Sequence, residues 1–64
     1  HRLEEVLVEM RNPRHPAQVK GRNRQGCPVF FEGDPALLVG KLVMVRIKEA
    51  QSYSLVGEQE GTPY

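Results

Sequence analysis

Residues 41–50 read KLVMVRIKEA and decide the fold class of this chain. In an extended chain successive side chains point to opposite faces. The alternation therefore sorts six residues into two sets, Val43, Val45 and Ile47 on one face and Met44, Arg46 and Lys48 on the other. A pattern of this length predicts a half-buried β-strand with one face in water.

Four further segments favour short strands, at residues 6–10, 17–23, 28–31 and 54–58. The second and third are expected to form a hairpin whose turn, residues 24–27, contains Gly26 in a positive-φ conformation. Gly21 lies inside a predicted strand, which indicates a bend or a close backbone approach. Together these features predict an all-β fold, a small five-stranded antiparallel β-barrel of OB-like or SH3-like size.

The connecting segments are rich in turn-forming residues. Residues 11–16 contain two prolines and predict a loop. Residues 37–40 predict a turn that lays Leu37 or Leu38 over an open end of the sheet, and residues 60–64 predict a frayed tail.

The length of 64 residues limits the chain to one domain with a thin core, which we place at about residues 5–58. Cys27 is the only cysteine, so an internal disulfide and a cysteine-based metal site are excluded. No apolar run is long enough to span a membrane. We expect a cytoplasmic, monomeric domain excised from a larger protein.

The net charge of +1 conceals an asymmetry along the chain. Residues 11–30 contain five Lys or Arg residues and no acid, whereas residues 49–64 contain three acids and no Lys or Arg. A polarised domain can present a basic face to a polyanion. The alternative is that exposed loops simply collect basic residues, or that residues 11–16 contact a protein partner.

Candidate RNA-binding residues follow from the predicted faces. Lys20, Arg22 and Arg24 share one face of the hairpin, and Arg46 and Lys48 share the exposed face of the long strand. If these strands are neighbours, five cations line one surface that can hold phosphates. The alternative for Arg46 is an ion pair with a glutamate of the first strand.

Phe30 is predicted to point away from the core, because Val29 and Phe31 alternate with it. An aromatic ring beside arginines can stack on an RNA base. It can equally cap one end of the barrel, and Tyr53 carries the same two interpretations.

Catalysis by this chain alone is not expected. The sequence has no glycine-rich phosphate loop and no carboxylate placed to orient His1 or His15. Cys27 in a turn is interpreted as a spectator, with a reactive thiol as the alternative. We therefore predict no catalytic and no metal-binding residues.

Five segments in this order resemble the TRAM domain that closes the MiaB-type tRNA methylthiotransferases. They are VLVE at 6–9, GRNR at 21–24, VFFEG at 29–33, GKLVMVRI at 40–47 and SLVGE at 54–58. The chain departs from the family's pattern at several positions. Asn23 replaces the usual threonine, and Val56 replaces a common arginine.

The resemblance implies a binding module rather than a complete enzyme. Its parent would be a radical-SAM tRNA methylthiotransferase with 4Fe–4S clusters and S-adenosylmethionine, which modifies the isopentenylated adenosine next to the anticodon. The module would bind and orient the anticodon arm of tRNA, with Asn23 counted among the RNA-binding residues. Its other partner would be the catalytic domain of the same chain. A structural barrel that docks on that domain, with little RNA affinity, is the alternative.

Overall fold

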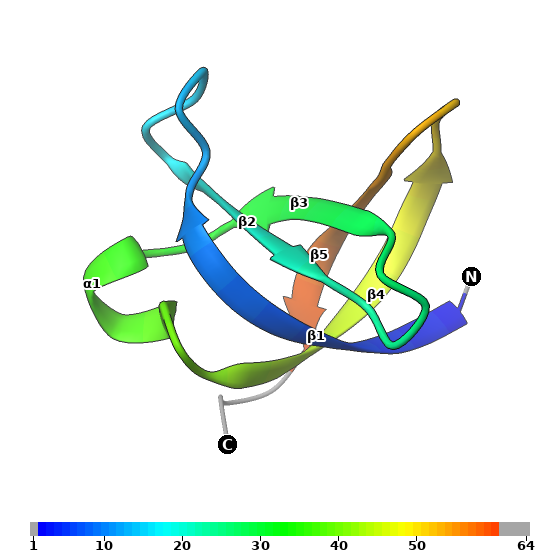
Figure 1. Cartoon of the computed structure of the whole chain (residues 1–64), viewed down its shortest axis with the longest axis horizontal. Helices are drawn as coiled ribbons and strands as arrows, with labels where there is room; N and C mark the ends of the chain where they lie inside the picture. The colour runs from blue at the N-terminus through cyan, green and yellow to red at the C-terminus, as the bar shows by residue number, and fades with distance from the viewer. Residues whose placement is uncertain (1, 61–64) are drawn as a thin grey trace.

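A computed structural model describes residues 2–60 of the chain. These residues form a closed five-stranded β-barrel with one short helix (Figure 1). The elements in chain order are β1 (Arg2–Arg11), β2 (Gln18–Arg22), β3 (Pro28–Glu32), α1 (Pro35–Leu38), β4 (Leu42–Ala50) and β5 (Leu55–Glu60). The strands close in the order β1-β2-β3-β5-β4, with β4 returning to β1. The all-β barrel predicted from the sequence is confirmed.

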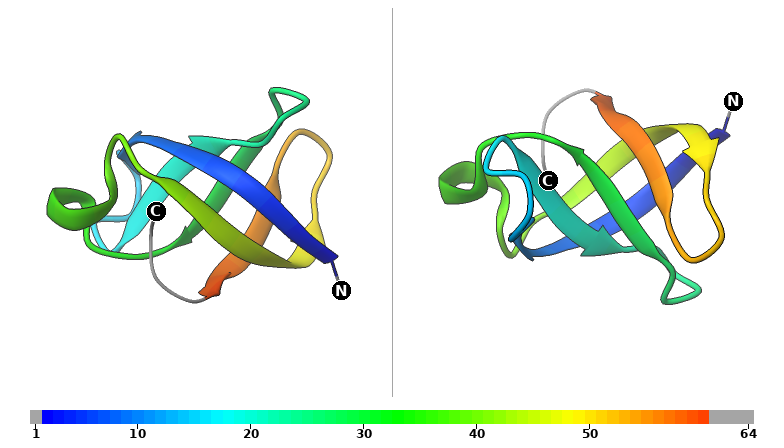
Figure 2. Two further views of the ribbon diagram at one scale, coloured as in Figure 1. Left: turned by 90° about the horizontal axis from the view of Figure 1, so that it is seen from below. Right: turned by 90° about the horizontal axis from the view of Figure 1, so that it is seen from above.

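One of the five strand pairings differs from the predicted antiparallel arrangement. Strand β3 pairs with β5 in parallel, whereas the other four pairings are antiparallel. A ring of strands that alternate in direction must contain an even number of members. A closed barrel of five strands therefore needs at least one parallel pair, and the two views in Figure 2 show how the strands wrap into this ring.

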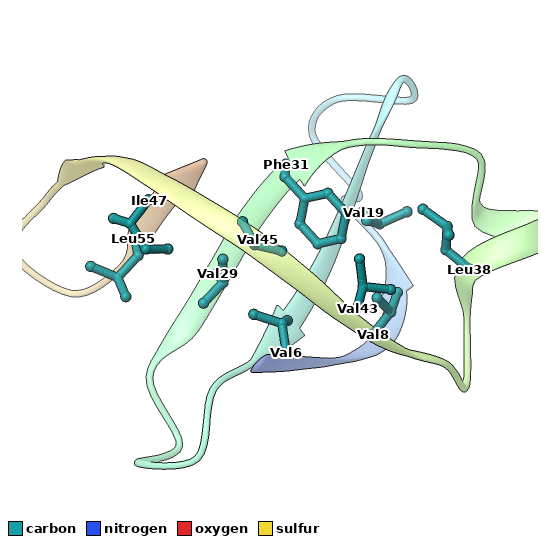
Figure 3. Close-up of a cluster of buried hydrophobic side chains, with 10 residues drawn as sticks. All are labelled: Val6, Val8, Val19, Val29, Phe31, Leu38, Val43, Val45, Ile47 and Leu55. Carbon is teal, nitrogen blue, oxygen red and sulfur yellow. The ribbon is translucent and has the colours of Figure 1, made fainter. Parts of the chain in front are cut away.

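The core is built from the inward faces of the strands, as the alternation predicts. Val43, Val45 and Ile47 are buried, and Phe31 is the largest fully buried side chain. Most of the buried side chains are β-branched, a shape that packs well on a pleated sheet. Figure 3 shows the ten members of this core, Val6, Val8, Val19, Val29, Phe31, Leu38, Val43, Val45, Ile47 and Leu55.

Two glycines allow the strands to approach closely. A Cβ atom on Gly21 would lie 2.5 Å from the carbonyl oxygen of Leu7 on the neighbouring strand β1. A Cβ atom on Gly57 would collide with the carbonyl oxygen of Arg46 on β4. The close backbone approach predicted at Gly21 is therefore confirmed, and barrel closure depends on it.

Helix α1 covers one end of the barrel. Asp34 accepts a hydrogen bond from the backbone N–H of Ala36 at 2.9 Å, and Pro35 opens the helix. Leu38 is 4% exposed and joins the core, whereas Leu37 is 67% exposed. Leu38, and not Leu37, is therefore the leucine that covers the open end of the sheet.

Strands β1 and β5 extend two or more residues beyond their predicted limits, and β3 extends one residue. Strand β1 starts at Arg2 rather than at Val6, because its first half pairs with β4 from Arg2 to Leu7. The sequence predicts a frayed tail that includes Glu60, but Glu60 belongs to β5, where it is paired with Met44. The rest of the predicted tail, residues 61–64, lies outside the described residues.

Candidate nucleic-acid interface

An open hollow lies on the outer side of β2, β3 and β5. Residues of the β1–β2 loop and of the β4–β5 turn line it, and Figure 1 shows these two segments rising from the barrel at the upper left and upper right. Its volume is about 530 Å³. The side chains that line it are Asn12, Pro13, Arg14, Gln18, Lys20, Phe30, Glu49, Gln51 and Val56. The hollow therefore combines an aromatic ring, two cations, three amides and one carboxylate.

Phe30 lies in this hollow, outside the buried core cluster. The strand register places it directly opposite Lys20 on β2 and opposite Val56 on β5. The predicted outward orientation of Phe30 is confirmed by its half-buried position. A ring between an ammonium group and an aliphatic side chain offers a stacking surface beside a positive charge.

The β1–β2 loop is held in shape by hydrogen bonds of Asn12. Its side-chain amide donates to Gln18 Oε1 at 3.1 Å, and its Oδ1 accepts from the backbone N–H of Arg14 at 3.0 Å. This Asx turn positions Arg14 at the rim of the hollow. Within residues 2–60, neither Arg14 nor Lys20 has an ion-pair partner, so both charges are available to a ligand.

The β4–β5 turn is also braced by hydrogen bonds. The backbone N–H of Gln51 donates to the carbonyl of Ser54 at 2.8 Å. The Gln51 amide donates to Glu49 Oε1 at 3.1 Å, and Ser54 Oγ donates to Gln51 Oε1 at 3.3 Å. Tyr53 lies in this turn and is 89% exposed, so it does not cap the barrel.

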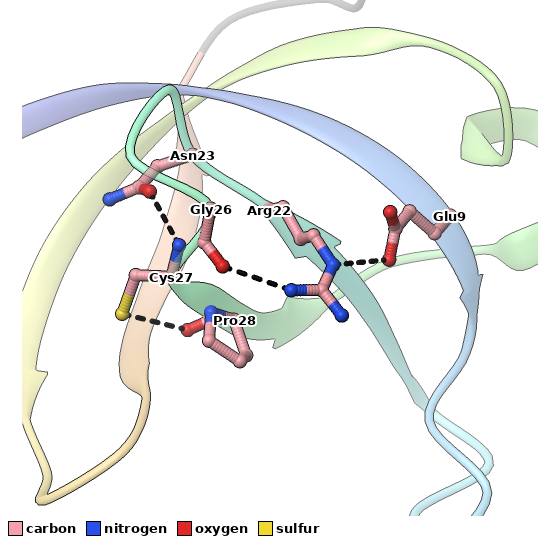
Figure 4. Close-up of polar contacts among 6 residues, drawn as sticks. All are labelled: Glu9, Arg22, Asn23, Gly26, Cys27 and Pro28. Carbon is pink, nitrogen blue, oxygen red and sulfur yellow. Dashed lines mark hydrogen bonds and ion pairs between the residues drawn. The ribbon is translucent and has the colours of Figure 1, made fainter.

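Arg22 and Arg24 flank the β2–β3 turn, and both face carboxylates of β1. Arg22 Nε lies 3.2 Å from Glu9 Oε1, and its Nη1 donates to the carbonyl of Gly26 at 3.0 Å (Figure 4). Arg24 Nε lies 4.0 Å from Glu5 Oε1 with most of its side chain in water. Exposed ion pairs of this kind contribute little to stability, so phosphates could replace the carboxylates.

Asn23 shapes the turn between these two arginines. It is 9% exposed, and its Oδ1 accepts from the backbone N–H groups of Cys27 and Gln25 at 2.9 and 3.1 Å. Its amide donates to Glu4 Oε1 at 3.2 Å. Gly26 has φ of 82°, as predicted for this turn. The side chain of Asn23 thus already has three partners within the fold.

Arg46 and Lys48 pair with carboxylates of β5. Arg46 Nε lies 3.1 Å from Glu60 Oε2, and Lys48 Nζ lies 3.7 Å from Glu58 Oε2. The hydrogen bond from Arg46 lowers the pKa of Glu60 below its ordinary value, and the positive charge of Arg46 lowers it further. The ion pair considered for Arg46 therefore exists, but its partner lies on β5 and not on the first strand.

The predicted surface of five cations does not form, because β2 and β4 are not neighbours. Strand β1 separates them on one side, and β3 and β5 separate them on the other. The structure brings Lys20 and Phe30 together in the hollow and leaves Arg46 and Lys48 apart from Arg22 and Arg24. RNA contact by these residues stays a prediction.

Four polar residues of the hollow are not among those predicted from the sequence, namely Asn12, Gln18, Glu49 and Gln51. From the sequence, Arg14 belongs only to the basic segment of residues 11–30. These four residues could have been predicted from the topology of the barrel. In five-stranded Greek-key barrels of the OB type, the face of strands 2 and 3 and the loops between strands 1 and 2 and between strands 4 and 5 form the ligand site.

Cys27 packs against the core in a half-buried position, and its thiol lies 3.7 Å from the carbonyl of Pro28. No group of three His, Cys, Asp or Glu residues within 2–60 could hold a metal ion. None of the helices in that range is long and apolar enough to cross a membrane.

Comparison with known protein families matches residues 2–59 to the TRAM domain. The chain belongs to the TRAM family. The five-stranded closed barrel is consistent with a TRAM domain, and the family is one of RNA-binding modules. A TRAM domain is a non-catalytic module, so this chain is a binding domain rather than an enzyme.

Proposed function

We propose that this TRAM domain binds tRNA through the hollow between the β1–β2 loop and the β4–β5 turn. The proposal rests on one observation: Phe30 lies directly opposite Lys20, and both side chains line the hollow. Arg14 adds a second cation at the rim, and like Lys20 it has no ion-pair partner within residues 2–60. An aromatic ring for a base and cations for the adjacent phosphates are the two components of single-stranded RNA recognition.

Arg22, Arg24 and Arg46 would extend the phosphate contacts outside the hollow, whereas Lys48 lies among Glu32, Glu49 and Glu58 and would contribute least. Each of the three arginines lies 3.1–4.0 Å from a surface carboxylate. A phosphate can replace that carboxylate at little cost, since exposed ion pairs are weak. Asn23 would act through the turn that holds Arg22 and Arg24 in place.

The parent protein in this proposal is a cytoplasmic radical-SAM tRNA methylthiotransferase of the MiaB type. The order and spacing of five segments along the chain support it, from VLVE at 6–9 to SLVGE at 54–58. The domain would orient the anticodon arm for the catalytic domain of the same chain, as a monomer. The 4Fe–4S clusters and S-adenosylmethionine would be held by that catalytic domain.

A salt titration of tRNA binding tests the proposal. The chain should bind an anticodon stem-loop at low salt, and Lys20→Ala and Arg14→Ala should each weaken binding and reduce the slope of log K against log salt by about one unit. Lys41→Ala is the matched control, because Lys41 is exposed but does not line the hollow. Equal losses in all three variants would show that only overall charge matters.

A second function, docking on the parent's catalytic domain, is favoured by an apolar stripe on the outer face of β1 and β4. Leu7 lies directly opposite Leu42, and they are 46% and 40% exposed. This stripe would give a protein partner an apolar contact. If the chain bound no tRNA at low salt, docking would be the better assignment.

A further inference from the structure

The two walls of the hollow carry different chemistry. The β1–β2 wall contributes Arg14, and Lys20 lies beside it on β2. The β4–β5 wall contributes Glu49 and Gln51. A phosphate backbone is attracted to the first wall and repelled from the second.

A neighbouring hollow of about 360 Å³ strengthens this asymmetry. It shares Gln18, Glu49 and Val56 with the first, and it adds further carboxylates. Its charged lining residues are Glu32, Lys48, Glu49 and Glu58. Three carboxylates against one ammonium disfavour phosphates on this side, so bases rather than phosphates should face the β4–β5 turn.

Tyr53 lies on the β4–β5 turn, and within the described residues its side chain has no evident role in the fold. It is 89% exposed, and it lies two residues beyond Gln51, which lines the hollow. The hydrogen bonds between Gln51 and Ser54 fix the turn that presents it. A preorganised turn loses less conformational entropy on binding than a flexible one.

We propose that Tyr53 is a second base-stacking residue and that the β4–β5 turn is the base-contacting wall of the site. The inference rests on the proposed RNA-binding function and specifies its ligand. The hollow takes a single-stranded segment of at least two nucleotides. One base stacks on Phe30, another stacks on Tyr53, and the phosphates face Arg14 and Lys20. Paired bases in a duplex cannot stack in this way.

Tyrosine fluorescence reports directly on this contact, because the chain has no tryptophan and only two tyrosines. In a Tyr64→Phe variant, Tyr53 is the only remaining tyrosine. We expect its emission to be quenched by a single-stranded RNA heptamer and far less by the same sequence in a hairpin stem. An unquenched Tyr53 at saturating heptamer would overturn the inference.

Measuring how the 64-residue chain binds this heptamer, in labelled form, distinguishes the stacking contact on the β4–β5 wall from the phosphate contacts of Arg14 and Lys20. Tyr53→Ala should weaken binding about tenfold without changing its salt slope, since stacking releases no counterions. Tyr53→Phe should restore binding, and Lys20→Ala should reduce the slope. The thermal midpoint of Tyr53→Ala should match that of the unmodified chain, because the residue is exposed.

The outcomes distinguish this inference from the function on which it rests. Binding that persists unchanged in Tyr53→Ala refutes the stacking role while leaving RNA binding in place. A reduced salt slope in Tyr53→Ala, or equal affinity for duplex and single strand, refutes it as well. Failure of the unmodified chain to bind any RNA at low salt refutes the proposed function itself.

Discussion

Phe30 and Phe31 are adjacent residues with opposite roles. Phe31 is fully buried among the core side chains, whereas Phe30 lies in the hollow beside Lys20 and Val56. The alternation of a β-strand separates them, so one stabilises the barrel and the other is available to a ligand. This pair allows stability and binding to be tested at neighbouring positions.

Replacing Phe31 with Ala should cost about 3–5 kcal/mol of folding free energy, because it empties the centre of a small core. Phe30→Ala should cost far less, yet it should weaken RNA binding by about 1–3 kcal/mol through the loss of stacking. Thermal unfolding and RNA affinity, measured on both variants, check this contrast. A large stability loss in Phe30→Ala would indicate a structural role for its ring.

Asn23→Ala should destabilise the fold by about 1–3 kcal/mol. The substitution leaves the backbone N–H groups of Gln25 and Cys27 without their acceptor at the β2–β3 turn. Denaturant unfolding measures the loss, with Gln25→Ala as the control, because the Gln25 side chain is exposed. If both substitutions had the same small effect, water would be replacing the Asn23 side chain.

At the scale of the elements, β4 and β5 are joined by the ion pair of Arg46 and Glu60 as well as by backbone pairing. The alternation of residues 41–50 was sufficient to predict which side chains of β4 face the core. It could not predict their outward partners, because Glu60 is 14 residues from Arg46 and meets it only through the strand register.

The ion pair predicts a pH dependence of stability. Because folding lowers the pKa of Glu60, the pair stabilises the fold above the ordinary carboxyl pKa, and this contribution is lost as the pH falls through the folded-state pKa. The difference in stability between the chain and Glu60→Gln should therefore be small at neutral pH and vanish in acid. High salt should reduce it too. A difference that grows on acidification would contradict this assignment.

Barrel closure predicts a strong effect at Gly21. An added Cβ would meet the carbonyl of Leu7 and the side chain of Val6, both on β1. Gly21→Ala should cost about 1–3 kcal/mol through overpacking. Gly26→Ala provides a comparison, because its Cβ would meet no atom within 4 Å and only the positive φ is strained. Equal unfolding midpoints for Gly21→Ala and the unmodified chain would mean that β1 can move away.

At the scale of the whole molecule, the barrel presents two different outer faces. The face of β2, β3 and β5 carries the hollow with Phe30 and Lys20, and the face of β1 and β4 carries the apolar pair of Leu7 and Leu42. The sequence predicted the barrel and the outward position of Phe30. It could not predict that β1 separates β2 from β4, since alternation defines the face of a strand but not its neighbours.

RNA binding in the hollow can be tested by following backbone amide shifts in an NMR titration with a tRNA anticodon stem-loop. We expect the largest shifts to cluster at Arg14, Lys20, Phe30 and Gln51, while Leu7 and Leu42 stay unchanged. Shifts confined to the outer face of β1 and β4, or no shifts at low salt, would contradict it.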